Sequence, residues 1–253
     1  GAPDPRLTPS GTIDFCLQRP LRSYTRADPP PSRVKPIPIS VIHHVLNAST
    51  VTTSPDHTTV ADMICIAFFF LMRPGEYTSG PSDTVPFTLA DIQLFIGRHR
   101  VNLFLAPLPE LHASTFTSYT YTTQKNGVRG EVVGLGRSGS PLACPVLATI
   151  RRVLHLRQHH APATTPLATY FTPTPGGSST RHPITASDVT FTLRLSVTAL
   201  GSGIGLLPDD ITARSLRVGG AMALLIAQVD SDIIRLIGRW RSDEMLRYLH
   251  LQA

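Results

Sequence analysis

The chain has 253 residues, enough for one large domain or two small ones, and its 42% of hydrophobic residues can form a packed core. The formal net charge of +6 favours polyanionic partners. The three cysteines are far apart and form no CxxC pair, which argues against a disulfide framework or a structural zinc site and fits an intracellular protein. The longest apolar run, residues 63–72, is far too short to span a membrane.

The first third of the chain changes from a proline-rich segment to helices. Residues 1–36 have many prolines and little hydrophobic periodicity, so we expect an arm or linker, partly in polyproline II conformation. The apolar pattern then predicts a helix over residues 39–46 and a buried helix over residues 58–71. The second helix must end near Arg73, because proline at position 74 disfavours a helical residue before it.

The middle of the chain has the composition of strands. Residues 89–96, 101–105, 115–123 and 131–135 are rich in β-branched and aromatic side chains, which predicts a small three-stranded antiparallel sheet. The sequence Lys125-Asn126-Gly127 is a tight-turn signal between two of these segments. Lys125 stands out because the chain has 21 arginines and only two lysines.

Helical patterns return in the second half of the chain. They cover residues 145–158, 186–200, 212–229, 231–236 and 242–249, and segments 172–177 and 201–208 are expected to be loops. Thr212, Ser231 and Ser242 are suitable N-caps for the last three helices. The fold class is therefore mixed α/β and mainly α-helical.

Two histidines of the helix at 145–158 have the spacing of metal ligands. His155 and His159 are four residues apart, but no glutamate lies between them and the helix is basic. A solvated helix face is favoured over a metal site.

A set of basic residues followed by a late tyrosine points to phosphodiester chemistry. The candidates are Arg73, Glu76, Lys125, Arg214, Arg217, Arg239, Trp240 and Tyr248. Transesterification of DNA needs a nucleophile, cations that offset the charge of the transition state, and a proton for the leaving oxygen. A phenol with a pKa of ~10 needs cationic help at neutral pH, and guanidiniums grip phosphate oxygens in a forked geometry.

Each candidate has an ordinary alternative. Taken alone, Arg73 is typical of a helix end, Lys125 of a turn and Tyr248 of a core or surface tyrosine. Their order, together with Arg73-x-x-Glu76 and the ten residues from Gly238 to Tyr248, resembles the catalytic domain of the tyrosine recombinase (phage integrase) family. The resemblance covers residues 29–253 and is greatest to recombinases of eukaryotic mobile elements of the DIRS and Crypton type.

The resemblance implies a role for each candidate. Tyr248 would form a 3′-phosphotyrosyl link, and Lys125 would protonate the leaving 5′-oxygen. Arg73 and Arg217 would hold the scissile phosphate, Arg214 and Arg239 would add charge or hydrogen bonds, and Glu76 and Trp240 would support them. The implied partners are double-stranded DNA and further copies of the chain, as a tetramer on DNA in the nucleus. No metal, cofactor or membrane is implied.

The chain also departs from the family pattern. Arg214 stands where the family has a histidine, and arginine cannot accept a proton from Tyr248. The N-terminal domain that clamps DNA in the family is absent or truncated, which leaves an arm of residues 1–36 and a catalytic domain of residues 37–253. Two alternatives stay open: a catalytically impaired DNA-binding remnant, and relaxation of DNA like that of a type IB topoisomerase.

Overall fold

The computed structural model describes residues 34–81, 85–122, 129–174 and 177–240. The described part is mixed α/β and mainly helical, as the sequence predicts. Within these ranges no helix is long and apolar enough to cross a membrane. The proposed division into an arm of residues 1–36 and a catalytic domain of residues 37–253 stays a prediction.

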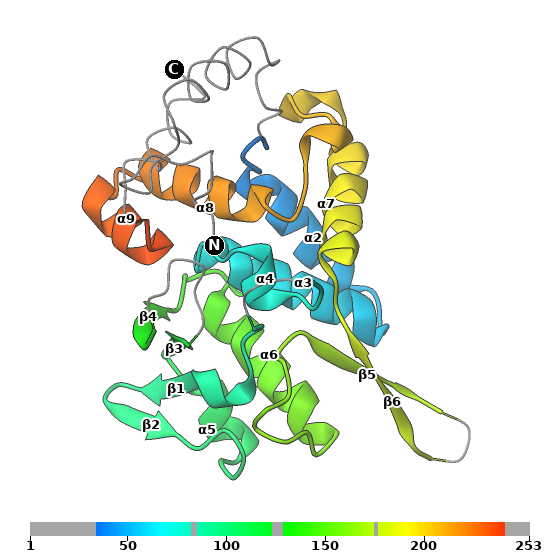
Figure 1. Ribbon diagram of the computed structural model, residues 1–253, viewed down its shortest axis with the longest axis vertical. Coiled ribbons are helices and arrows are strands. Elements are labelled where there is room, and N and C mark those ends of the chain that lie inside the picture. The colour runs from blue at the N-terminus through cyan, green and yellow to red at the C-terminus, as the bar shows by residue number, and fades with distance from the viewer. Residues whose placement is uncertain (1–33, 82–84, 123–128, 175–176, 241–253) are drawn as a thin grey trace, which may run out of the picture. The chain divides into compact units, whose positions relative to one another are not determined.

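A buried helix lies at the centre of the described fold. Helix α2 spans Ile39–Thr50, α3 spans Pro55–Phe69 and α4 spans Pro74–Tyr77. Helix α3 is apolar on all faces and packs against α2, α6, α7 and α8, as Figure 1 shows for its central position. It ends before Arg73, whose backbone is extended as proline at position 74 requires.

The sheet has four strands, not the three expected. Its strands are β1 (Ile92–Ile96), β2 (His99–Val101), β3 (Phe116–Tyr121) and β4 (Glu131–Gly136), in the antiparallel order β2-β1-β3-β4. A 3-10 turn, η1 (Leu89–Asp91), precedes β1, and a short helix, α5 (Leu108–His112), precedes β3.

The strand segment expected at 101–105 had the wrong bounds: β2 spans His99–Val101, and residues 102–105 lie outside any strand. Ile96 pairs with His99 across a two-residue loop, and Gly97 at its first position has a φ of 57°. Glycine in that position suits a tight turn between antiparallel strands. Strand β2 is short and mostly exposed, so it lacks the run of apolar residues by which strands were predicted.

The second half of the fold begins with a long helix and a separate hairpin. Helix α6 spans Pro145–Gln158, β5 spans Thr169–Pro173, β6 spans Ser179–Pro183 and α7 spans Ala186–Leu200. Helices α6 and α7 have the predicted bounds. The loop expected at 172–177 was wrong in part, because Thr172 and Pro173 belong to β5. A two-stranded ribbon tolerates Pro173 and Pro183 at the ends of its strands.

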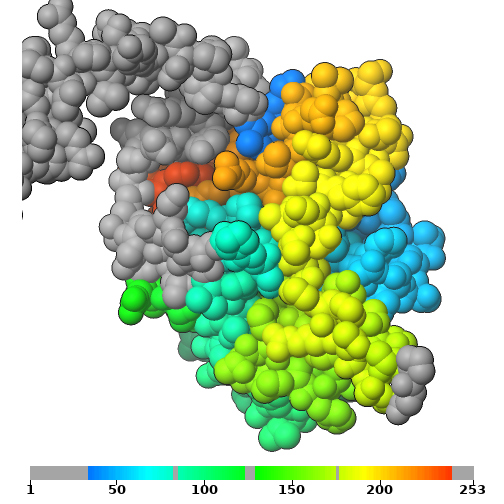
Figure 2. All heavy atoms as spheres, turned by 45° about the vertical axis from the view of Figure 1, so that its right-hand side comes forward, coloured from blue at the N-terminus to red at the C-terminus, as the bar shows by residue number. Residues whose placement is uncertain are grey.

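Helix α7 is visible on the face shown in Figure 2, beside the start of α3. It is followed by two 3-10 turns, η2 (Ser202–Ile204) and η3 (Pro208–Asp210), and by α8 (Ser215–Ile226) and α9 (Ser231–Gly238). The helix expected at 242–249, with its N-cap Ser242, lies outside the described residues.

Both N-caps predicted for the described C-terminal helices were wrong. Helix α8 begins at Ser215, because Thr212 uses its carbonyl and hydroxyl oxygens in the preceding turn, where they accept bonds from Ser215 N and Arg214 N. Helix α9 is capped by Asp230, whose carboxylate accepts a bond from Asp232 N at 2.7 Å. Both helices were predicted; α9 begins at the predicted Ser231, whereas α8 begins three residues later than predicted.

Helix α8 packs unusually close to the preceding elements. A Cβ atom at Gly219 would lie 2.3 Å from the carbonyl oxygen of Ile37, and one at Gly220 would lie 2.2 Å from that of Phe68. Only glycine permits these contacts. They bring the start of α8, which carries Arg217, against the end of α3.

The interpretation of His155 and His159 as a solvated face was wrong. Their rings lie 5.0 Å apart, and the His159 ring stacks on Phe171 of β5 at 4.5 Å. Burial, followed by the charges of Arg152 and His159, lowers the pKa of His155 to about 4. The pair therefore packs the β5–β6 hairpin onto α6. The described residues contain no group of three or more His, Cys, Asp or Glu side chains placed to hold a metal ion.

Candidate functional site

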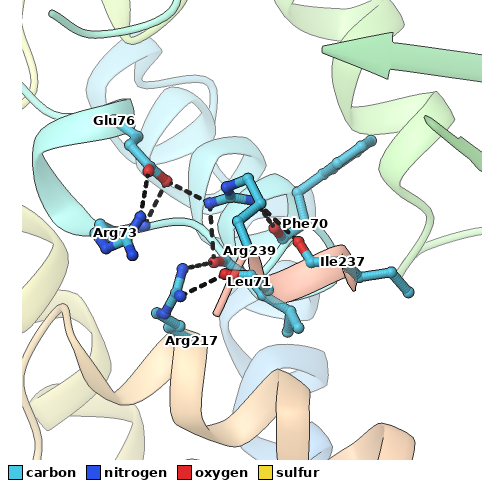
Figure 3. A network of polar contacts seen from close by, with 8 residues as sticks. Phe70, Leu71, Arg73, Glu76, Arg217, Ile237 and Arg239 are labelled. Carbon is cyan, nitrogen blue, oxygen red and sulfur yellow. Dashed lines mark hydrogen bonds and ion pairs between the residues drawn. The ribbon is translucent and has the colours of Figure 1, made fainter. Parts of the chain in front are cut away.

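Two arginines bond to one glutamate, and a third shares a carbonyl oxygen with one of them. Arg73 is the N-cap residue of α4, Glu76 lies in α4, Arg217 lies in the first turn of α8, and Arg239 follows α9. Figure 3 shows Glu76 between Arg73 and Arg239, with Arg217 below them. We call these four residues the arginine cluster.

Glu76 is held by both backbone and side-chain bonds. Its Oε2 accepts bonds from Arg73 N at 2.8 Å and from Arg239 Nη2 at 2.8 Å, and its Oε1 accepts one from Arg73 Nη1 at 3.1 Å. The Glu76 side chain is 2% exposed, so these charge-assisted bonds lie away from water. Glu76 thus fixes the distance between Arg73 and Arg239.

Both Nη atoms of the Arg239 guanidinium donate hydrogen bonds to protein acceptors. Its Nη1 donates to the carbonyl oxygens of Phe70 at 3.3 Å and Ile237 at 2.9 Å, and its Nη2 donates to Leu71 O at 3.4 Å as well as to Glu76. Its side chain is fully buried. The role predicted for Arg239, to add charge or hydrogen bonds at a phosphate, stays a prediction; in the described residues both of its Nη atoms donate to protein acceptors.

Arg217 is anchored from two sides. Its Nη1 donates to Leu71 O at 2.7 Å, its Nη2 donates to Gly238 O, and its guanidinium lies 4.1 Å from the centre of the Trp240 ring. These two bonds use part of the five N–H donors of a guanidinium, so donors remain for another acceptor.

Arg217 and Arg239 both donate to the carbonyl oxygen of Leu71, a residue with a positive φ. Leu71 has a φ of 50°, which is uncommon for a residue other than glycine. Residues held in such conformations often mark functional sites, where the surrounding contacts offset the strain. Here, the contacts are two guanidiniums that bind the same carbonyl oxygen.

The cluster carries an excess of positive charge in a desolvated place. Among the described residues, Glu76 is the one carboxylate paired with guanidiniums of the cluster: it bonds to Arg73 and Arg239, whereas Arg217 bonds to the carbonyl oxygens of Leu71 and Gly238. Burial, and then the charges of Arg73 and Arg239, lower the pKa of Arg217 to about 9, which still leaves it charged at neutral pH. Arg73 is the accessible member, with 27% of its side chain exposed. An anion would relieve the repulsion among the three cations.

Tyr121 belongs to this site and was missed by the sequence analysis. Its ring lies 3.7 Å from the Arg239 guanidinium, at the end of β3. Burial raises the pKa of Tyr121, whereas the charges of Arg239, Arg217 and Arg73 oppose that change, so its hydroxyl lies in the field of all three cations. The available signal in the sequence was its position at the end of the strand that leads to Lys125.

Arg214 is the remaining candidate among the described residues, and it is not part of the cluster. Arg214 is exposed just before α8, and its side chain makes no hydrogen bond or ion pair with the described residues. Lys125 and Tyr248 lie outside the described residues.

A cavity elsewhere in the fold does not compete with this site. It has a volume of about 480 Å³ and lies between α2, α3 and α7, where His44, Tyr170 and Phe191 contribute to its walls. None of the candidate residues of the described part lines it.

Comparisons with known proteins yield distant structural similarity. No protein-family model and no curated protein matches the chain. The structure is similar to a chain of the FLP recombinase–Holliday junction complex, with a TM-score of 0.46 and 9% identity over 94% of this chain and 51% of the other. It is also similar to the Tn1549 transposon integrase in complex with circular intermediate DNA, with a TM-score of 0.43 and 15% identity over 87% of this chain and 62% of the other. The chain thus spans about half to three fifths of those chains. Both TM-scores lie below 0.5, so this similarity assigns no function to the chain.

Proposed function

We propose that this chain is a tyrosine recombinase that cleaves and rejoins DNA through a 3′-phosphotyrosyl intermediate, for the integration of a mobile element. The observation that carries the proposal is the arginine cluster, in which three guanidiniums lie together and one carboxylate pairs with two of them. A tetrahedral or pentavalent phosphate is the anion whose charge and forked contacts suit such a group.

The proposed roles follow the accessibility of the side chains. Arg73, which is part-exposed, and Arg217, which has free donors, would bind the non-bridging oxygens of the scissile phosphate. Arg239 would hold Glu76 and the Leu71 carbonyl in place through the hydrogen bonds that its Nη2 donates to both. Tyr248 would attack the phosphorus, the 5′-oxygen would leave, and Lys125 would supply its proton. This set offsets the transition-state charge with side chains, and we expect it to need no metal or cofactor.

The proposal is tested by trapping the intermediate. A nicked suicide substrate lets the cleaved fragment diffuse away, so the enzyme stays attached to DNA. We expect a covalent adduct with the wild-type chain and none with Tyr248→Phe. An adduct that survives in Tyr248→Phe would show that another group attacks. Relaxation of supercoiled plasmid without any sequence requirement would instead favour the alternative of a type IB topoisomerase.

The second candidate function, a DNA-binding remnant, is favoured by the position of Arg214. This arginine replaces the histidine that the family uses, and its exposed side chain lies free of the arginine cluster. Acid–base help from such a histidine typically contributes about 10²–10⁴-fold to rate.

We therefore predict that Arg214→His speeds formation of the adduct by about 10²-fold. The fold should tolerate the change, because the side chain is exposed. The measurement is the single-turnover rate on the suicide substrate, with Arg214→Gln as the control that removes the charge without adding an acid–base group. An unchanged or lower rate in Arg214→His would contradict the assignment, and cleavage by none of the variants would favour the remnant.

Self-association on DNA is part of the same proposal. Apolar side chains are exposed on α8 and α9, and such patches are typical of protein interfaces. They are Leu225, Ile226, Ile233 and Leu236. Mass photometry of the DNA complex should show a tetramer, and the single substitution Leu236→Lys should reduce its population.

A further inference from the structure

Tyr121 connects the sheet to the arginine cluster. It is the last residue of β3, is 1% exposed, and pairs with Glu131 of β4. Its ring is held between two neighbours: the Phe87 ring meets it edge-on with centroids 4.7 Å apart, and the Arg239 guanidinium lies 3.7 Å from its centre. The orientation of the ring is therefore set by the sheet and by Phe87.

The guanidinium on this ring is the hub of the cluster. Arg239 bonds to Glu76, which bonds to Arg73, and it shares the Leu71 carbonyl with Arg217. A rotation of the Arg239 guanidinium would break both connections. Hydrogen-bond acceptors hold the Arg239 guanidinium within its plane. The Tyr121 ring packs on one face of that plane, where there are no N–H groups to donate hydrogen bonds.

The Tyr121 contact acts through the ring rather than through the hydroxyl. The hydroxyl is buried and makes no hydrogen bond with the residues that the structure describes. Attraction between a guanidinium and an aromatic face is strongest where water is excluded, and both partners are buried here. Replacing an unpaired buried hydroxyl by hydrogen is close to neutral for stability.

We infer that Tyr121 is a positioning residue of the arginine cluster: its ring fixes the Arg239 guanidinium, which holds Glu76 and the Leu71 carbonyl where Arg73 and Arg217 can bind one phosphate. The inference rests on the proposed function and adds a residue to it. Tyr121 itself does not touch the phosphate.

The test compares two buried tyrosines of the same strand. Tyr119 lies two residues earlier on the same face of β3 and is also buried, but its ring contacts Phe70 and Phe87, and its hydroxyl bonds to Thr149. Tyr119→Leu therefore removes an equal ring without touching a guanidinium. The other variants are Tyr121→Leu and Tyr121→Phe, and Tyr121→Met serves if the leucine variant fails to fold.

Two measurements are made on the full chain at a temperature where every variant is folded. The first is affinity for a short DNA duplex at fixed salt. We expect Tyr121→Leu to bind roughly tenfold more weakly, and Tyr121→Phe and Tyr119→Leu to bind like the wild type. The second is exchange of the Arg239 Nε proton by NMR, which should be slow in the wild type and in Tyr121→Phe, and fast in Tyr121→Leu.

The outcomes separate this inference from the proposed function. Wild-type affinity in Tyr121→Leu, or an equal loss in Tyr121→Phe, would overturn the inference while leaving the function intact. If the wild type binds no DNA, the proposed function fails. In that case, exchange of the Arg239 Nε proton still tests the positioning role of Tyr121. Equal exchange rates in the wild type and Tyr121→Leu would overturn that role.

Discussion

Glu76 is the residue on which the balance of charge in the cluster depends. It accepts bonds from Arg73 and Arg239, and removing one partner of a buried charge pair leaves the other uncompensated. Glu76→Gln keeps the size of the side chain but leaves three buried or part-buried guanidiniums without a carboxylate. We expect the free energy of unfolding to fall by about 3 kcal/mol.

The same substitution gives a test for anion binding. Sulfate should recover more stability in Glu76→Gln than in the wild type, because an anion that binds only the folded state stabilises it. Glu110→Gln is the matched control, since Glu110 forms a part-exposed pair with His99. Thermal unfolding across sulfate concentrations measures the difference, and equal sulfate responses in all three proteins would argue against an anion site.

Part of this site could be predicted from the sequence, because some of its residues belong to short motifs whereas others depend on tertiary contacts. Arg73 and Glu76 were chosen from one short motif and bond to each other, and Arg217, chosen from another, lies over the ring of Trp240, although their catalytic roles stay predictions. Tyr121 and Leu71 were missed because their contributions depend on tertiary contacts. A ring below a guanidinium and a carbonyl turned by a φ of 50° leave no local pattern in the sequence.

At the scale of elements, the position of α8 controls the cluster. Gly220→Ala would place a methyl group 2.2 Å from the Phe68 carbonyl oxygen, so α8 must shift away from the end of α3. We predict a loss of about 1–3 kcal/mol in unfolding free energy and weaker DNA binding, because Arg217 moves with α8. Gly203→Ala is the control: nothing lies within 4 Å of its Cβ position. Equal unfolding free energies for the two variants in urea titrations would contradict this account.

The hairpin β5–β6 should respond to pH through His155. Its pKa of about 4 in the folded state lies below the usual value of 6.5, so the unfolded chain binds more protons between these values. Stability should therefore be intact above pH 6.5 and should fall as the pH drops toward 4. Urea unfolding at pH 7.5 and 5.0 measures the effect, which His155→Phe should diminish and the exposed control His43→Phe should not. A wild type equally stable at both pH values would refute the prediction.

Elements were predictable where periodicity was strong. Helices α6 and α7 have the predicted bounds because each shows one apolar face over more than three turns. Strand β2 was predicted with the wrong bounds and the end of β5 was assigned to a loop, because both belong to short hairpins that depend on backbone pairing rather than on an apolar run. The start of α8 and the N-cap of α9 were misplaced, because Thr212 and Asp230 could each serve a turn or a cap.

At the scale of the whole molecule, the proposed function depends on the binding of a DNA phosphate by the arginine cluster. The direct measurement is the affinity for duplex DNA over a range of salt concentrations. Wild-type affinity should fall steeply with salt. Arg73→Gln should bind more weakly at every concentration and reduce the slope of log affinity against log salt by about one unit, the signature of one lost phosphate contact. Arg194→Gln is the control, because Arg194 of α7 is paired with Asp209 of η3. An Arg73→Gln variant that is folded and keeps the wild-type affinity and slope would contradict the account.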